Sequence, residues 1–205
     1  MKTDAHFILK DTMSHKDITG FIKPWMKKKN VYTRIYNYTL MSGLFLAGAW
    51  LGTMLSSGEF RFEVVNHFFL GAMLGVFMIP IHEGLHGIAY KMMGAESVQY
   101  RANWRKLVFY AAANDFPAGY KEFRFVALLP FSVITVLGLM IMIWSGFEWV
   151  ALMSGFILGH AACCGGDFGL LSYMHEHKEL DVITIDDMEK GETRFMIRKL
   201  HSERL

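Results

Sequence analysis

Two histidines and a glutamate lie close together in an otherwise apolar stretch. Within residues 78–90, the order His82-Glu83-Gly-Leu-His86 places the two imidazoles four positions apart. On a helix, positions i and i+4 share a face, so both rings can ligate one metal ion. Glu83 lies on the flank of that face, within reach of a water molecule at the ion. This H-E-x-x-H spacing predicts a zinc ion (Zn2+) held by His82 and His86, with Glu83 as the catalytic base.

Four apolar runs must position these groups. The chain is 53% hydrophobic and 20% charged, which is too apolar for an ordinary soluble domain of 205 residues. Each run is long enough to cross a bilayer as a helix. Pro80 is expected to kink the second run just before His82. The predicted spans are residues 38–57, 64–90, 123–144 and 149–174.

A catalytic zinc needs a third protein ligand and one open position. Asp167 is the preferred candidate, because it is the only acidic residue deep in the first, third or fourth span. At 1.5 Å per residue, Asp167 lies roughly 12 Å from the predicted membrane face, and the two histidines lie roughly 7 and 13 Å from it. His160 is the alternative ligand, although it lies about 10 Å deeper and fits better as a buried hydrogen-bonding histidine. Cys163 and Cys164 are interpreted as small packing residues outside any disulfide framework.

The predicted fold class is an all-α integral membrane protein of about four transmembrane helices. A small β-hairpin on the cytoplasmic side is expected in residues 91–122, where polar and apolar residues alternate, and a second hairpin fits the tail. The chain has three expected parts. They are a cytoplasmic basic leader (1–37), a four-helix membrane metallopeptidase domain (38–175) and a short cytoplasmic C-terminal extension (176–205). The leader is interpreted as a solvated segment that sets topology, in preference to one that lies on the membrane surface.

Basic residues predict the orientation of the spans. Lys and Arg gather before the first span, between the second and third, and after the fourth, whereas the other two connections hold only Arg61. The positive-inside rule then places both termini and the hairpin in the cytoplasm of a multi-pass cell (inner) membrane protein. With a net charge of +2 and no nucleic-acid motif, nucleic acid is excluded as a partner.

The chain resembles the membrane zincins in four places. It is similar to the site-2 protease class of intramembrane metalloproteases and, more closely, to a family of short bacterial zincin peptidases of unknown function. The resemblance spans about residues 64–175 and rests on the segments IHEGLHG (81–87), LVFY (107–110), FVALLP (125–130) and GGD (165–167).

This resemblance implies that His82, His86 and Asp167 bind zinc and that Glu83 is the catalytic acid and base. It also implies that residues 91–122 lie at the membrane face and help to present substrate. One departure concerns the third ligand. Site-2 proteases usually carry Asn and Pro before the aspartate and Gly after it, whereas here Ala-Ala-Cys-Cys-Gly-Gly precedes Asp167 and Phe168 follows. The metal site carries over, but the substrate cleft and the specificity do not.

The expected activity is zinc-dependent hydrolysis of peptide bonds in membrane or membrane-proximal substrates. Glu83 would take a proton from a zinc-activated water and pass it to the leaving amine. The expected partners are a membrane-protein or peptide substrate and the lipid bilayer. One alternative is a non-hydrolytic membrane metal- or haem-binding protein, since paired histidines on facing helices also ligate haem. Another is a proteolytically silent homologue that binds partner helices.

Overall fold

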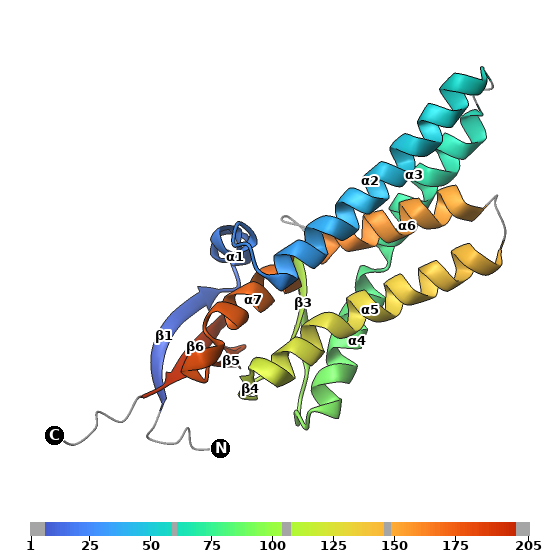
Figure 1. The fold of residues 1–205 in the computed structure, drawn as a ribbon. Helices are drawn as coiled ribbons and strands as arrows, with labels where there is room; N and C mark the ends of the chain where they lie inside the picture. The colour runs from blue at the N-terminus through green and yellow to red at the C-terminus, as the bar shows by residue number, and fades with distance from the viewer. Residues whose placement is uncertain (1–6, 59–60, 104–107, 146–148, 200–205) are drawn as a thin grey trace.

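The computed structural model describes residues 7–58, 61–103, 108–145 and 149–199. Within these ranges the chain is mostly helical, with two small antiparallel sheets (Figure 1). Residues 104–107 and 146–148 lie outside the described residues. In chain order the elements are β1 (Phe7–Ser14), α1 (Ile18–Met26), α2 (Val31–Ser57), α3 (Phe62–Phe77), α4 (Ile79–Met92), β2 (Gln99–Asn103), β3 (Val108–Ala112), β4 (Ala118–Gly119), α5 (Tyr120–Trp144), α6 (Trp149–Cys163), α7 (Gly165–Glu176), the 3-10 helix η1 (Lys178–Leu180), β5 (Ile183–Asp187) and β6 (Glu192–Arg198).

Among the described residues, three helical stretches are long and apolar enough to cross a membrane, namely residues 31–57, 62–92 and 120–144. The pair α6 and α7 makes a fourth if it is counted as one span. The helix of the first predicted span, α2, begins at Val31, earlier than the predicted residue 38. Asn30 explains this start, because its side chain accepts hydrogen bonds from the backbone N–H groups of Tyr32 and Thr33.

The leader, the tail and residues 118–119 form one four-stranded sheet. Its strand order is β1-β6-β5-β4, and all three strand pairs are antiparallel. The expected hairpin β2–β3 is present, and β5–β6 forms the second hairpin in the tail. The all-α prediction is therefore wrong in this respect, and the leader is more than a solvated segment. The pairing of β1 with β6 joins residues from distant parts of the chain, such as Met13 and Thr193, and beside it the His15 side chain contacts that of Thr193, 178 positions away. A local sequence pattern carries no signal of such contacts.

Two of the predicted spans are broken. The second stops at Met78, and α4 then begins with Pro80 in its first turn, as the predicted kink requires. The fourth was predicted as a continuous helix, but α6 and α7 meet at Cys164 with a bend of 51°. At Cys164 the backbone closes a tight turn onto the Ala161 carbonyl, and Gly165 and Gly166 follow, both poor helix formers.

Glycines bring α3 and α6 into backbone contact. Gly71 and Gly75 of α3 face α6, while Gly155 and Gly159 of α6 face α3. A methyl group built on any of these four would overlap backbone atoms of the other helix. Such pairs of small residues four positions apart allow membrane helices to approach closely. Because α3 and α6 are held together, the segments that follow their breaks, α4 and α7, start side by side.

The best-packed part of the core surrounds α7. Phe168, Leu171 and Tyr173 of this helix are fully buried, and Phe195 of β6 packs with them. The helix is covered by α1, α2 and α5 and by the four-stranded sheet (Figure 1). By contrast, many large apolar side chains on α2, α3 and α5 are exposed, a distribution compatible with a membrane protein.

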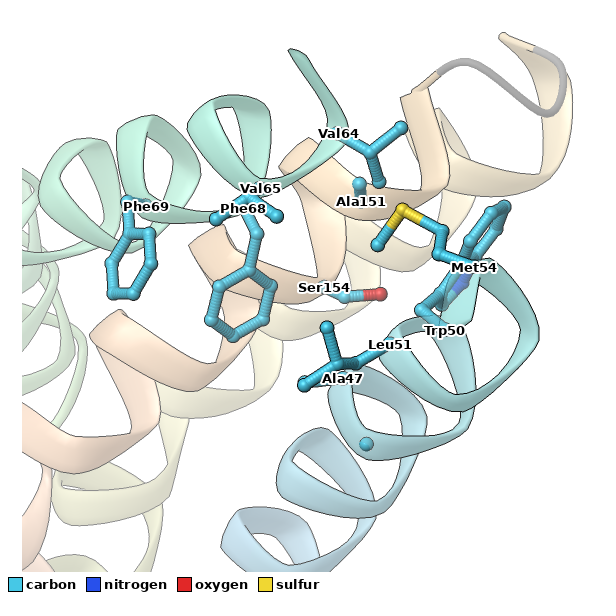
Figure 2. Close-up of a pocket in the computed structure, with 11 residues that line it drawn as sticks. Ala47, Trp50, Leu51, Met54, Val64, Val65, Phe68, Phe69, Ala151 and Ser154 are labelled. Carbon is cyan, nitrogen blue, oxygen red and sulfur yellow. The ribbon is translucent and has the colours of Figure 1, made fainter. Parts of the chain in front are cut away.

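A cavity of about 240 Å³ opens between α2, α3 and α6. Figure 2 shows its lining, in which Trp50, Leu51 and Met54 of α2 stand opposite Val65 and Phe68 of α3. None of the described residues around it is titratable, so this cavity offers no acid, base or metal ligand.

Candidate metal centre

Two imidazoles and one carboxylate converge where α4 passes α7. The i, i+4 spacing on α4 aims both rings to one side, with centroids 4.6 Å apart. His82 Nε2 lies 3.1 Å from Asp167 Oδ2, and His86 Nε2 lies 3.1 Å from Asp167 Oδ1. All three ligand atoms lie within 4.8 Å of one another. The structure thus brings together the three residues that the sequence analysis selected.

The break in the fourth span places the carboxylate. Asp167 stands in the first turn of α7, where the free backbone N–H groups of a helix start favour a negative charge. Its side chain is 22% exposed, compared with 7% for His82 and 8% for His86. The cluster of His82, His86 and Asp167 is therefore buried on its histidine side and open to solvent on its carboxylate side.

The outer nitrogens of both histidines have partners. His86 Nδ1 lies 2.9 Å from the Val126 carbonyl oxygen, which can only accept a hydrogen bond. Nδ1 therefore carries the proton, and the lone pair of Nε2 is directed at the Asp167 side. His82 Nδ1 lies 3.0 Å from His160 Nε2. Outer hydrogen bonds of this kind fix ring orientation in metal sites.

Glu83 lies beside this group without a full set of hydrogen bonds. Its carboxylate accepts a hydrogen bond from the backbone N–H of Ala111 on β3. Its Oε2 atom is buried and has no hydrogen-bond partner among the described residues. A free, buried carboxylate oxygen next to two imidazoles is available to accept a proton from a small molecule in the cleft.

Two adjoining clefts reach the site. The larger has a volume of about 220 Å³ and the smaller of about 80 Å³, and Glu83 and Asp167 line both. Tyr110 of β3 also lines both, and burial raises the pKa of its phenol, so it presents a neutral hydroxyl at ordinary pH. The larger cleft is lined by Ile18, Thr19, Ile22, Ile79, His82, Glu83, Phe109, Tyr110, His160, Cys163, Gly166, Asp167 and Leu170.

The alternative ligand, His160, lies on the far side of His82. It is fully buried, and it meets Nδ1 of His82, whereas Asp167 meets Nε2. Cys164 Sγ lies 3.8 Å from His160 Nε2, so His82, His160 and Cys164 form a second group of metal-ligand types. Both cysteines are free. Cys164 is buried, and Cys163 is exposed and lines the larger cleft.

Sequence reasoning missed two contributions to the site. The Val126 carbonyl that orients His86 is a backbone group, for which no residue type gives a signal. The α1 residues in the cleft were missed because the leader was read as separate from the membrane domain, although Ile18 and Ile22 stand at helical spacing.

The donor set fits a zinc ion. Two N or O ligands at tetrahedral positions on zinc lie roughly 3.4 Å apart, close to the two contacts of 3.1 Å measured to Asp167. Nitrogen and carboxylate ligands, one of them open to solvent, are the set found in catalytic rather than structural zinc sites.

Comparison with known proteins gives one match. Residues 75–180, just over half of the chain, match a family model described as "Putative zincin peptidase". This range contains every residue of the metal centre and of its two clefts except the α1 residues that line the larger cleft. No curated protein and no solved structure matches the chain.

Proposed function

We propose that this chain, which belongs to the family described as "Putative zincin peptidase", is a membrane-embedded zinc metalloprotease. The family implies a metallopeptidase that uses zinc. The observation that carries the proposal is the convergence of His82, His86 and Asp167 beside the unpaired carboxylate oxygen of Glu83. The substrates are peptide bonds in membrane proteins or in segments close to the membrane.

The residues divide the work between binding and proton transfer. His82, His86 and Asp167 would hold the ion, and when bound, zinc lowers the pKa of a water molecule and polarises the scissile carbonyl. Glu83 accepts the water proton at Oε2 and delivers it to the leaving nitrogen. The hydrogen bond from Ala111 holds the Glu83 carboxylate on the β3 side of the cleft. Tyr110 offers its hydroxyl in the same cleft.

The membrane location is supported by the three long apolar helices and the bent α6–α7 pair. In Figure 1, β1, β6, β5 and β4 gather at one end of the molecule, while α2 and α5 end and α3 and α6 begin at the other. This arrangement suits four passes with both termini on one side. The distribution of Lys and Arg assigns that side to the cytoplasm. Water would then reach the site from the cytoplasm.

Substrate presentation is assigned to the hairpin β2–β3. Phe109 and Tyr110 line the cleft, and among the described strands β3 pairs only with β2, so no further described strand lies along its other edge. An unwound substrate segment would add to such an edge through backbone hydrogen bonds. Replacing Tyr100 or Val108 with proline should therefore reduce cleavage without releasing zinc. Unchanged cleavage in both variants would remove the hairpin from the mechanism.

The decisive experiment compares the wild type with Glu83→Gln and Asp167→Ala in lipid nanodiscs. Bound metal is measured by mass spectrometry, and hydrolysis is measured on a panel of single-span peptides carrying a fluorescent reporter pair. We expect Glu83→Gln to keep zinc and to lose at least about 100-fold in cleavage rate, the lower range for general-base catalysis. Asp167→Ala should lose both zinc and cleavage. Full activity in Glu83→Gln would refute the assignment.

The same preparation separates the alternatives. Haem ligation by the paired histidines would give a strong visible absorption band, which a zinc protein lacks. A wild type that binds zinc and cleaves no peptide in the panel would favour the proteolytically silent homologue.

A further inference from the structure

Helix α1 is firmly attached to the protein by one of its faces. The Phe21 ring stacks on Phe195 of β6, with centroids 5.1 Å apart and an interplanar angle of 5°. Trp25 meets the edge of Tyr173 at 4.9 Å, and its carbonyl accepts a hydrogen bond of 2.9 Å from Ser172 of α7. A helix with two aromatic anchors and a hydrogen bond to buried residues is a fixed part of the fold.

A glycine lets α1 lie directly on α7. A methyl group built on Gly169 would lie 2.7 Å from the Cβ of Ile22, too close for any real contact. Because Cβ is fixed to the backbone, relief would need a shift of α1 itself. Ile22 therefore stands within a van der Waals contact of the helix that carries Asp167.

The adjoining face of α1 borders the larger cleft. Ile18, Thr19 and Ile22 line it together with His82, Glu83 and Asp167. Phe109 and Tyr110 of β3 line the same space. Apart from the catalytic group and His160, the described lining carries no charged side chain, so a charged substrate residue entering here would be buried without a partner.

We propose that α1 is a wall of the catalytic cleft and that Ile18, Thr19 and Ile22 determine which substrate side chains it admits, selecting apolar residues next to the bond that is cut. The inference rests on the proposed peptidase function for its substrate, and it adds a specificity element outside the matched family region, residues 75–180.

The variant Thr19→Asp tests the wall with little risk to the fold. Thr19 is exposed and stands in the first turn of α1, where an aspartate stabilises a helix. It would place a negative charge at the cleft. The matched control is Thr12→Asp, an exposed position on β1 that does not line the cleft. Ile22→Ala is the companion variant, which removes part of a side chain in the wall and so widens the cleft.

The first measurement needs neither zinc nor substrate. Cys163 is exposed and lines the cleft, so its rate of reaction with cationic and anionic methanethiosulfonate reagents reports the local charge. Cys163→Ser gives the background. We expect Thr19→Asp to raise the ratio of cationic to anionic rates by about threefold or more, and Thr12→Asp to leave it unchanged. An unchanged ratio in Thr19→Asp would show that α1 does not border the space that Cys163 occupies.

The second measurement is the cleavage profile on the same panel of single-span peptides, varied at the residues flanking the cut. We expect Thr19→Asp to shift preference toward Lys and Arg, and Ile22→Ala toward larger apolar residues. Profiles identical to the wild type would overturn the specificity role. If no variant cleaves anything, the peptidase proposal fails, while the reagent ratio still decides whether α1 forms the wall.

Discussion

His160 offers a sharp test of how the metal centre is built. Its Nε2 lies 3.0 Å from His82 Nδ1, and the residue is fully buried at the edge of the larger cleft. If His82 binds zinc through Nε2, its Nδ1 carries a proton and donates a hydrogen bond to His160 Nε2. Removing such an outer partner costs typically 10–100-fold in metal affinity, or about 1.4–2.7 kcal/mol.

We expect His160→Ala to weaken zinc binding by this factor. The affinity is measured by competition with a chromophoric chelator in detergent micelles, and circular dichroism reports helix content. His160→Gln should recover most of the loss, since its side-chain oxygen reaches toward the position of Nε2 and accepts a hydrogen bond. His67→Ala, at an exposed position on α3, is the control for loss of a histidine remote from the metal-ligand groups.

Two results would refute the reasoning. Unchanged zinc affinity in a well-folded His160→Ala would mean that the contact with His82 does not orient the ligand. A loss far beyond 100-fold that Gln does not recover, together with intact binding in Asp167→Ala, would make His160 the third ligand in place of Asp167.

Two further predictions concern the scaffold. Gly155→Leu should lower the free energy of unfolding by about 1–3 kcal/mol and weaken zinc binding, because the new side chain would force α3 away at Phe68. Gly52→Leu, in open space, should change neither. Burial raises the pKa of Asp186 to about 6, so the protonated form is preferred on folding. The contribution of Asp186 to stability should therefore be fully present below about pH 4 and be lost, by roughly 3 kcal/mol in all, as pH rises through 6 to above 7, as measured by melting temperature. This dependence should disappear in Asp186→Asn and persist in Asp181→Asn.

The sequence predicts what depends on local chemistry. The H-E-x-x-H spacing needs only a helix to bring His82 and His86 together, and the long apolar runs need only their length. The depth estimate that selected Asp167 treated the fourth span as one straight helix, whereas Asp167 lies beside the histidines in α7, after the 51° bend. The predicted break at Met78 and the unexpected break at Cys164 both follow the last glycine contacts between α3 and α6.

What the sequence does not reveal depends on contacts between distant residues. Residues 7–14 read FILKDTMS, a pattern too irregular to predict a strand, and they become β1 only because β6 pairs with them. The glycine contacts between α3 and α6 could have been found, since Gly71, Gly75, Gly155 and Gly159 stand in two GxxxG patterns. The role of α1 in the cleft follows from neither pattern, because it requires the sheet to be in place.

The pairing of the first strand with the last has a consequence for biosynthesis. Ribosomes add about 5–20 residues per second, so roughly 10–35 s separate the appearance of His15 from that of Thr193, 178 positions later. Phe195, on which Phe21 stacks, is made 28 residues after Asp167 (195 − 167), when His82, His86 and Asp167 are already in the chain. The proposed wall of the cleft is therefore complete only after the C-terminal strand has been made, later than all three proposed metal ligands.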